Sequence, residues 1–222
     1  MLEKIDLEAK ISKADYRQAM DALDVRLAEL QRGIQAAGIP VVVVMEGWDA
    51  AGKGAALSRV LQALDPRHFK VHNVREPTEY ERMFPRMHRF WQMLPARGNI
   101  AIYNHSWYRL VFDERVAGEV KPAVVREAFE DIRVFERQLA ADGAAVVKFF
   151  LHIAKEEQAK RFAKLSKDKA FAWKVGEAER FRHKRYDTFY AAVEDALVET
   201  SAPHAPWSVV PASNERYCKL RI

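Results

Sequence analysis

A strand-like apolar run followed at once by a glycine-rich loop constrains the fold of this chain more than any other feature of its sequence. The run from Val41 to Met45 is apolar at every position and lies between Pro40 and Gly47. Such a run suits a strand that is covered on both faces, as in a parallel sheet. The residues from Gly47 to Gly54 fit the pattern G-x-x-x-x-G-K, and a helical pattern follows them. The sequence therefore predicts a phosphate-binding loop directly after the first strand of an α/β fold.

The residues of this loop have the properties that phosphate binding requires. Glycines allow a tight turn in which several backbone N–H groups point into one hollow. The N-terminus of the following helix adds the positive end of its dipole, and Lys53 adds a full charge for the terminal phosphates. We predict that phosphate is bound by Gly47, Ala50, Ala51, Gly52, Lys53 and Gly54.

One position of the loop departs from the usual motif. The residue after the lysine is commonly Ser or Thr, whose hydroxyl binds Mg²⁺, but here it is Gly54. The loop also contains Asp49, and a carboxylate is unfavourable in an anion-binding loop unless a cation lies beside it. We infer that Asp49 binds Mg²⁺ or orients the accepting group, which compensates for the missing hydroxyl. The alternative is a turn aspartate that points outward.

Strand and helix patterns alternate along the rest of the chain, after an N-terminal helix predicted over residues 12–37. Further strands are expected at 69–74, 99–104, 146–153 and 208–210. Further helices are expected at 55–64, 121–141, 156–165 and 176–199. This alternation predicts an α/β fold with a central, mostly parallel five-stranded sheet and helices on both faces. The apolar stripe from Tyr16 to Ile34 could pack on its own domain or form a dimer contact.

Composition narrows the class of protein. The 222 residues, of which 49% are hydrophobic and 30% charged, are typical of one globular domain. No apolar run approaches the roughly 20 residues of a membrane span, and the first residues carry no secretory pattern. The single cysteine, Cys218, excludes an intrachain disulfide. We therefore expect a cytoplasmic protein.

The net charge of +5 arises from one segment of the chain. Residues 155–185 contain eleven Lys and Arg residues against five Asp and Glu residues. A concentrated basic segment indicates a polyanionic partner, and a solvated helix face is the alternative. Its candidate phosphate contacts, which could close as a lid, are Arg161, Lys164, Lys167, Lys169 and Lys174.

Three segments together resemble the polyphosphate kinase 2 family, whose members move a phosphoryl group between inorganic polyphosphate and nucleotides. They are EGWDAAGKG at the loop, RFWQMLPARGNIAIYNHSWYR around the third strand, and VFDERV after it. The resemblance runs from about residue 10 to residue 221. It implies one P-loop phosphotransferase domain over residues 1–222, folded as a kinase-like three-layer sandwich with a helical lid at about 155–185. It also implies a homodimer or homotetramer.

The resemblance assigns roles to matching positions of this sequence. It implies that Asp49 and Lys53 are catalytic and that Arg115 lies near the phosphates. It implies that Arg161 and Lys174 are basic positions of the lid. Residues 76–78 match a family segment that lines the acceptor side.

Two positions differ from the family pattern. Asn104 and His105 stand where most members have Asp and Arg before Ser-Trp-Tyr. An amide oxygen is a weaker Mg²⁺ ligand than a carboxylate, and an imidazole titrates near neutral pH whereas a guanidinium is always charged. We keep both residues as candidate catalytic groups, and Asp49 and Asn104 as candidate Mg²⁺ ligands. The chain is then either an active enzyme, which the retained Lys53 and basic lid favour, or a weakened copy that binds polyphosphate without turnover.

Other functions fit the sequence less well. A P-loop kinase for another small phosphate acceptor would not need the extended basic segment. Nucleic-acid binding is suggested by charge alone, without a recognition motif, so we expect neither a nucleic-acid nor a membrane partner. Arg82, Arg86 and Arg89 could face the anion channel or solvent. The sequence does not decide between AMP and ADP, between adenine and guanine, or between the two directions of transfer.

Overall fold

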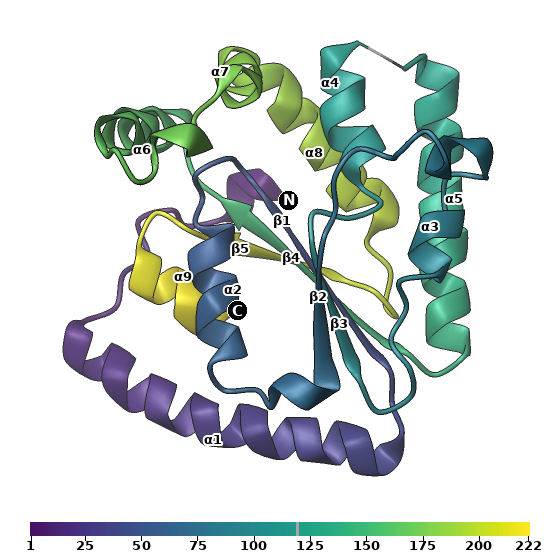
Figure 1. Cartoon of the computed structure of the whole chain (residues 1–222). Helices are drawn as coiled ribbons and strands as arrows, with labels where there is room; N and C mark the ends of the chain where they lie inside the picture. Colours follow the sequence, from purple (N-terminus) through teal and green to yellow (C-terminus); the bar gives the residue numbers. More distant parts are fainter. Residues whose placement is uncertain (119) are drawn as a thin grey trace.

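The computed structural model describes residues 1–118 and 120–222. In this part of the chain, five parallel strands form one sheet in the order β2-β3-β1-β4-β5 (Figure 1). The strands are β1 (Val41–Gly47), β2 (Phe69–Asn73), β3 (Ile100–Asn104), β4 (Ala145–His152) and β5 (Trp207–Pro211). The predicted parallel sheet is confirmed, and each expected strand ends within two residues of its observed bounds.

The register of the strands brings their carboxyl ends to one side of the sheet, which we call the carboxyl edge. Asn104 at the end of β3 pairs with Met45 of β1 and with Asn73 of β2. Gly47 at the end of β1 pairs with Leu151 of β4. The segments that follow these strands therefore meet at the carboxyl edge, where open parallel sheets bind their ligands.

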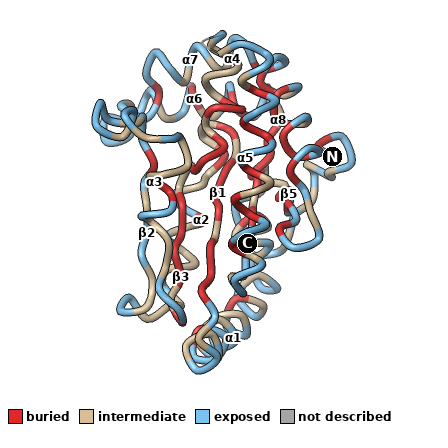
Figure 2. Tube along the Cα trace, turned by 90° about the vertical axis from the view of Figure 1, so that its right-hand side faces the viewer, coloured by how far each residue is buried: buried red, intermediate tan, exposed pale blue. Residues whose placement is uncertain are grey.

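Helices cover both faces of the sheet (Figure 1). One face carries α1 (Lys13–Ala37), α2 (Lys53–Leu61) and α9 (Glu215–Arg221), and the other carries α5 (Pro122–Ala141) and α8 (Tyr186–Thr200). Buried residues concentrate in β1 and β3 between these layers, as Figure 2 shows. The predicted three-layer arrangement is confirmed. Short helical segments are η1 (Leu2–Lys4), η2 (Pro66–His68), η3 (Glu81–Met83), α3 (His88–Trp91), η4 (Leu110–Glu114), α4 (Arg115–Ala117) and η5 (Ala172–Lys174).

The N-terminal helix α1 begins and ends where its sequence predicts. The hydroxyl of Ser12 accepts a hydrogen bond from the backbone N–H of Asp15, and Gly38 ends the helix with a φ of 64°. Met20 is buried but Leu30 is 57% exposed, so the predicted apolar stripe packs on the domain only in part. Of the helices in the described part of the chain, none combines the length and the apolar character that crossing a membrane requires.

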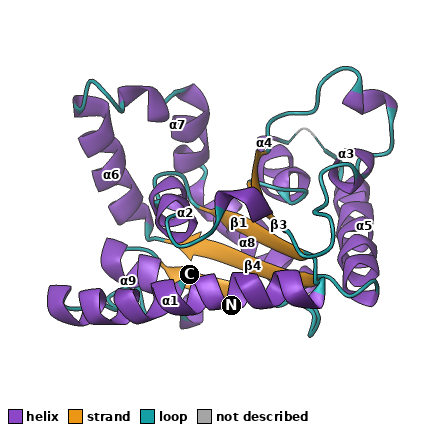
Figure 3. Ribbon diagram, turned by 60° about the horizontal axis from the view of Figure 1, so that its bottom comes forward, coloured by secondary structure: helices purple, strands orange, loops and turns teal. Residues whose placement is uncertain are grey.

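Two helices, α6 (Lys155–Lys167) and α7 (Glu177–Lys184), stand beside α2 on the side away from α5 (Figure 3). We call residues 155–185 the lid. The sequence predicts one helix over 176–199, and this is wrong because α7 and α8 are separated at Arg185, whose φ is −105° and ψ 26°. Tyr186 stacks on Trp48, which fixes the start of α8 on the core while α7 turns toward the carboxyl edge. No glycine or proline marks this break in the sequence. Tertiary packing sets the break, so a helical pattern alone does not predict it.

Candidate active site

We call the loop after β1, residues 47–54, the phosphate loop. Several of its residues have a positive φ, which few residue types adopt easily. Gly47 has a φ of 145°, and a Cβ atom there would lie 2.6 Å from the carbonyl oxygen of Leu151. Ala50 has a φ of 60°, and Gly52, with a φ of 104°, is the N-cap of α2. These positive φ values turn the chain tightly between strand and helix, as an anion-binding loop requires.

Lys53 folds back over the phosphate loop. Its Nζ atom donates hydrogen bonds to the carbonyl oxygens of Gly47 at 2.6 Å and Trp48 at 3.2 Å. Because Lys53 is the first residue of α2, its ammonium group and the helix N-terminus both place positive charge at this loop. A phosphate would offer the ammonium group a charged acceptor in place of two neutral ones.

The phosphate loop is anchored to the core by Trp48, which is 3% exposed. Its indole ring stacks on Tyr186 of α8, with 4.2 Å between ring centroids. Its Nε1 atom donates a hydrogen bond to Nδ1 of His152 at 2.8 Å. This hydrogen bond needs a neutral imidazole, and burial lowers the pKa of His152 to about 4.

The buried histidine makes stability depend on pH. Free histidine titrates near pH 6.5, so between pH 6.5 and about 4 the unfolded chain binds a proton that folded His152 does not. Stability is therefore complete above pH 6.5 and falls toward pH 4, by about 3 kcal/mol for this group. Urea unfolding at pH 7 and pH 4.5, followed by tryptophan fluorescence, should show a smaller loss for His152→Asn, whose amide oxygen can accept from Trp48. Equal losses in both proteins would contradict this role.

The lid holds the phosphate loop through backbone carbonyl groups. Gln158 Nε2 donates a hydrogen bond to the carbonyl oxygen of Asp49 at 3.1 Å. Arg161 donates to four backbone carbonyl oxygens, those of Ala50, Ala51, Ala212 and Ser213. Arg161 thus directs its guanidinium group at protein acceptors and connects the lid, the phosphate loop and the segment after β5. Its predicted contact with phosphate stays a prediction.

The side chain of Asp49 is paired with an arginine of the lid. Arg182 Nε lies 2.7 Å from Oδ2 of Asp49, and Arg182 Nη2 lies 3.1 Å from Oδ1. Burial alone raises the pKa of Asp49, but the hydrogen bonds and the charge of Arg182 outweigh burial and hold this pKa below its ordinary value. Asp49 is therefore a charged carboxylate whose two oxygens both face a guanidinium group. Sequence reasoning missed Arg182, because nothing in the sequence distinguishes it from the other basic residues of the lid.

Two further carboxylates that the sequence analysis did not select lie close to this pair. Asp113 Oδ1 lies 4.0 Å from Nε of Arg182, and burial is the main cause that raises the pKa of Asp113. Glu46 is 3% exposed and lies 3.4 Å from Nδ1 of His105. With Asp49, these residues line a small cavity of about 20 Å³ at the carboxyl edge. His105 thus lies in this cluster, and its predicted catalytic role stays a prediction.

Asn104 lies at the end of β3, where its Nδ2 atom donates to Oδ1 of Asn73 at 2.9 Å. In residues 1–118 and 120–222, no group of three or more His, Cys, Asp or Glu side chains is arranged to hold a metal ion. One or two protein oxygens are enough to hold a small, hard divalent cation when water and substrate phosphates complete its ligands. Asp49 and the amide oxygen of Asn104 are the candidate ligands, provided that Arg182 releases the Asp49 carboxylate.

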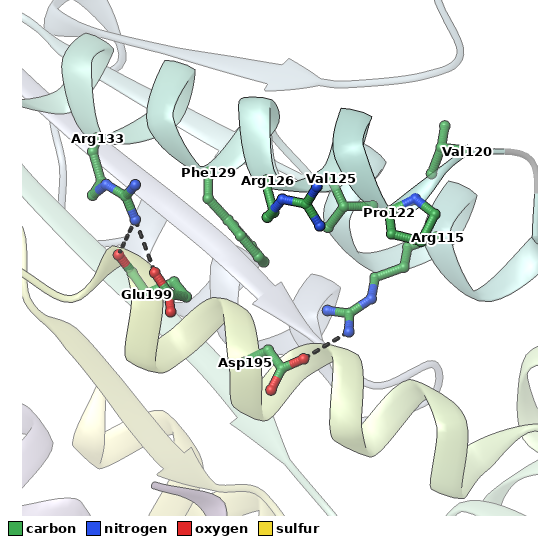
Figure 4. Close-up of a pocket in the computed structure, with 9 residues that line it drawn as sticks. All are labelled: Arg115, Val120, Pro122, Val125, Arg126, Phe129, Arg133, Asp195 and Glu199. Atoms are coloured by element: carbon green, nitrogen blue, oxygen red, sulfur yellow. Dashed lines mark hydrogen bonds and ion pairs between the residues drawn. The ribbon is translucent and has the colours of Figure 1, made fainter.

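Arg115 lies outside this cluster, in a different cavity (Figure 4). The cavity of about 620 Å³ lies between α5 and α8, and Nη2 of Arg115 is 2.6 Å from Oδ2 of Asp195 there. Arg133 pairs with Glu199 at the other end, and Arg126 projects between the two pairs. The structure does not bring Arg115 together with the phosphate loop, so its predicted place near the phosphates stays a prediction.

A cavity of about 470 Å³ lies between the phosphate loop and α6. Residues 50–52 line one part of it, and Lys160 and Lys164 of α6 line another. Lys164 therefore lies beside the loop, as expected for a phosphate contact. Lys174 does not share this cavity, since it is exposed on η5 with its Nζ 4.6 Å from the ring centre of Phe171.

A further cavity, of about 240 Å³ and here called the arginine cavity, opens after the end of β3. Arg86 Nε and Nη1, Arg89 Nε and Arg109 Nε are buried and make no hydrogen bond to the described residues. Phe90 and Trp107 line the same cavity. Arg89 Nε lies 3.3 Å from Oε1 of Glu81, and Arg109 Nε lies 4.0 Å from Oε1 of Glu114, as ion pairs rather than hydrogen bonds. Because buried N–H groups normally have acceptors, the two Arg86 donors suit an oxyanion. From the sequence, three arginines could face either an anion channel or solvent. All three line this cavity: Arg82, Arg86 and Arg89.

A parallel sheet with a glycine-rich phosphate loop between its first strand and a helix that starts at a lysine defines the P-loop type of α/β fold. The chain belongs to the polyphosphate kinase 2 (PPK2) family, whose model matches residues 10–222. The predicted family is thereby confirmed.

Relatives and solved structures agree with this membership. The chain is 37% identical over 222 residues to the polyphosphate:AMP phosphotransferase of Pseudomonas aeruginosa. This match covers all of the present chain and 45% of the Pseudomonas protein. It is 32% identical over 213 residues to the GDP-polyphosphate phosphotransferase of Mycolicibacterium smegmatis, covering 96% of this chain and 75% of that protein. Polyphosphate kinase 2 from Arthrobacter aurescens TC1 superimposes with a TM-score of 0.94 at 30% identity, over 100% of this chain and 81% of that one. The chain thus spans less than half of the Pseudomonas relative.

Proposed function

We propose that this protein transfers a phosphoryl group between inorganic polyphosphate and a nucleoside mono- or diphosphate, with Mg²⁺ as cofactor. The observation that carries the proposal is that the phosphate loop, which contains Asp49 and Lys53, borders a cavity lined by Lys160 and Lys164. The arginine cavity lies at the same carboxyl edge, beside the ends of β2 and β3. The relatives named for AMP and for GDP support both classes of acceptor.

The chemistry needs positioned charge rather than a covalent protein intermediate. Lys53 and the N–H groups of the phosphate loop would hold the transferring phosphate, and Lys160 and Lys164 would bind the polyphosphate chain beside it. Closure of the lid would exclude water and leave the acceptor phosphate as the nucleophile. Mg²⁺ would neutralise charge on the phosphate oxygens, and its proposed ligands are Asp49 and Asn104.

The arginine cavity is the proposed place of the nucleotide. The guanidinium groups of Arg86, Arg89 and Arg109 suit the acceptor phosphates, which would replace the carboxylates that now face Arg89 and Arg109. The apolar wall of the cavity, which includes Phe84, suits a base. A further cavity is lined by Arg82, Arg109, Asp113 and Arg182. It connects the arginine cavity with the small cavity that Asp49 lines. This continuity supports transfer from the phosphate loop to an acceptor held by the arginines.

The quaternary state and the location remain proposals as well. We propose a cytoplasmic homodimer or homotetramer. Val25 and Leu30 of α1 are 61% and 57% exposed, which supports a contact between subunits. Cys218 is a buried free thiol, which suits a reducing compartment. Sedimentation velocity of the purified protein measures the subunit number, and a monomer would contradict the proposed assembly.

A nucleotide assay tests the proposed activity. The purified protein is mixed with Mg²⁺ and long-chain polyphosphate, and AMP, ADP, GMP and GDP are offered separately. Ion-exchange chromatography then resolves the products. A nucleoside di- or triphosphate that forms only with polyphosphate supports the proposal and identifies the acceptor. No product from any acceptor would contradict it.

A second function is favoured by Asn104 and His105. These residues replace the carboxylate and guanidinium groups of most family members, which weakens a metal site and removes a fixed charge. The alternative is therefore a protein that binds polyphosphate without turnover. Calorimetric binding of polyphosphate, together with no product in the nucleotide assay, would support this alternative over the enzyme.

Asn104→Asp is expected to lower the Mg²⁺ concentration needed for half-maximal activity by about tenfold. The substitution exchanges a neutral amide oxygen for a carboxylate, a stronger ligand for a hard cation, and about 1.4 kcal/mol of added binding is tenfold. Asn73 can retain the contact by donating its amide N–H. The measurement is initial rate against Mg²⁺ at saturating substrates. Asn99→Asp is the matched control, at a half-buried amide whose Nδ2 donates to the carbonyl oxygen of Arg97. An unchanged Mg²⁺ dependence would remove Asn104 from the ligand set.

A further inference from the structure

The guanidinium group of Arg182 occupies the place at Asp49 that a divalent cation would need. Its Nε and Nη2 atoms bind both oxygens of the Asp49 carboxylate, at 2.7 and 3.1 Å. The two side chains are only 23% and 17% exposed, so water competes weakly for the pair. A metal ion that binds Asp49 must approach these same oxygens.

Arg182 has other anionic partners beside it. Its Nη2 atom lies 3.0 Å from Oε1 of Glu179 on the same helix, and its Nε lies 4.0 Å from Asp113. Three carboxylates therefore surround one guanidinium group. Lys53 also acts on the Asp49 carboxylate through its charge. The repulsion between a divalent ion and Arg182 opposes both cations sharing the two Asp49 oxygens.

Among the described residues, the other hydrogen bonds between the lid and the phosphate loop go to backbone carbonyl groups. Gln158 of α6 donates to the Asp49 backbone carbonyl group, and Arg161 of α6 donates to the carbonyl groups of Ala50 and Ala51. Helix α6 can therefore stay attached when the carboxylate changes partner. Helix α7 contributes Arg182, so α7 is the part of the lid that responds.

We propose that Arg182 is a built-in counter-cation of Asp49 that exchanges with the divalent ion, so that metal binding releases α7 and frees the Arg182 guanidinium group for the phosphate chain. This inference rests on the proposed function, because it assumes a divalent cation at Asp49. It makes Arg182 a positioning residue that couples metal occupancy to the docking of the lid. The free enzyme then keeps α7 docked on the phosphate loop through Asp49. Metal binding releases α7, and the lid closes again when Arg182 binds the phosphate chain.

Mn²⁺ binding in the absence of nucleotide and polyphosphate tests the exchange. Free Mn²⁺ is measured by electron paramagnetic resonance for the wild type, Arg182→Gln and Asp49→Asn. Arg182→Gln is expected to bind Mn²⁺ about tenfold more tightly, since the metal no longer displaces a charge-assisted hydrogen bond. Asp49→Asn is expected to lose this binding. Arg182→Lys retains the charge but loses the paired geometry, and it should fall between Arg182→Gln and the wild type.

Arg180→Gln is the matched control, because Arg180 lies on the same helix and its Nη2 atom donates to Ser166 Oγ at 3.3 Å. It should bind Mn²⁺ as the wild type does. Trypsin cleavage within the lid gives a second measurement. Mn²⁺ should accelerate cleavage of the wild type, whereas Arg182→Gln should be cleaved rapidly with or without Mn²⁺.

Mn²⁺ affinities that are equal in the wild type and Arg182→Gln, or no Mn²⁺ binding in either, would overturn the exchange. Its failure is distinguishable from failure of the proposed function. If the nucleotide assay yields product while Arg182→Gln leaves the Mn²⁺ affinity unchanged, only the exchange is wrong. If no nucleotide is phosphorylated while Arg182→Gln binds Mn²⁺ more tightly, the exchange holds and the proposed activity fails.

Discussion

Lys53→Ala is expected to lower the rate of phosphoryl transfer by about 10²–10³-fold, the usual cost of removing one preorganised donor to developing charge. The Nζ atom of Lys53 lies over the phosphate loop, 2.6 Å from the carbonyl oxygen of Gly47. Its charge adds to that of the α2 N-terminus, and alanine leaves only the dipole and the backbone N–H groups. The measurement is kcat/KM in the nucleotide assay, together with the melting temperature of each variant.

Two other substitutions separate loss of charge from loss of fold. Lys53→Arg retains the charge but spreads it over a planar group that the tight loop does not accommodate equally well, so an intermediate rate is expected. Lys70→Ala removes an exposed lysine of the edge strand β2 and should leave the rate unchanged. Near-normal kcat/KM in a folded Lys53→Ala protein would show that phosphate is bound elsewhere.

Lys148→Met is expected to lower the free energy of unfolding by about 3–5 kcal/mol, as for other buried ion pairs that lose one partner. Lys148 of β4 has no exposed surface, and its Nζ lies 2.6 Å from the carboxylate of Glu136 and 2.9 Å from the hydroxyl of Tyr108. Burial lowers the pKa of Lys148 and raises the pKa of Glu136, while their mutual attraction opposes both shifts. Methionine fills the space but leaves the carboxylate without its cation. Urea unfolding measures the loss.

The double variant Lys148→Met with Glu136→Gln is the control for this prediction. Glutamine removes the uncompensated charge and retains an oxygen for the hydrogen bonds that Glu136 accepts from Trp107 and Tyr108. At least half of the lost stability should therefore return. If the double variant is no more stable than Lys148→Met, the loss comes from packing rather than from the buried charge. Since Trp107 and Tyr108 follow the Asn104 segment, this cluster also supports the active site.

The local parts of the fold were predictable from the sequence. The strand ending at Gly47 and the helix starting at Lys53 follow from an apolar run, glycine turns and helix signals within a few residues. The carboxyl edge follows as well, because parallel strands place their following segments together. Asp49 lies in the phosphate loop, His105 lines a small cavity with it, and Lys164 lines a cavity beside the loop. Their predicted roles stay predictions.

Long-range partners were not predictable in the same way. Arg182 is 133 residues from Asp49 in the chain. Its contact with Asp49 depends on the break between α7 and α8 at Arg185, which the packing of Tyr186 on Trp48 imposes. Asp113 and Glu46 carry no motif of their own. Charge alone gave no preference among the basic residues of the lid, because their direction depends on tertiary contacts.

The measurement that tests the proposed activity most directly is transfer of ³²P from labelled polyphosphate to an unlabelled nucleotide. Wild type and Lys53→Ala are compared with Mg²⁺ and each acceptor, and the nucleotides are separated from polyphosphate and inorganic phosphate. We predict label in the terminal phosphate of a nucleoside di- or triphosphate with the wild type, reduced about 10²–10³-fold in the variant. Label that stays in polyphosphate, or appears only as inorganic phosphate with every acceptor, would contradict a polyphosphate:nucleotide phosphotransferase.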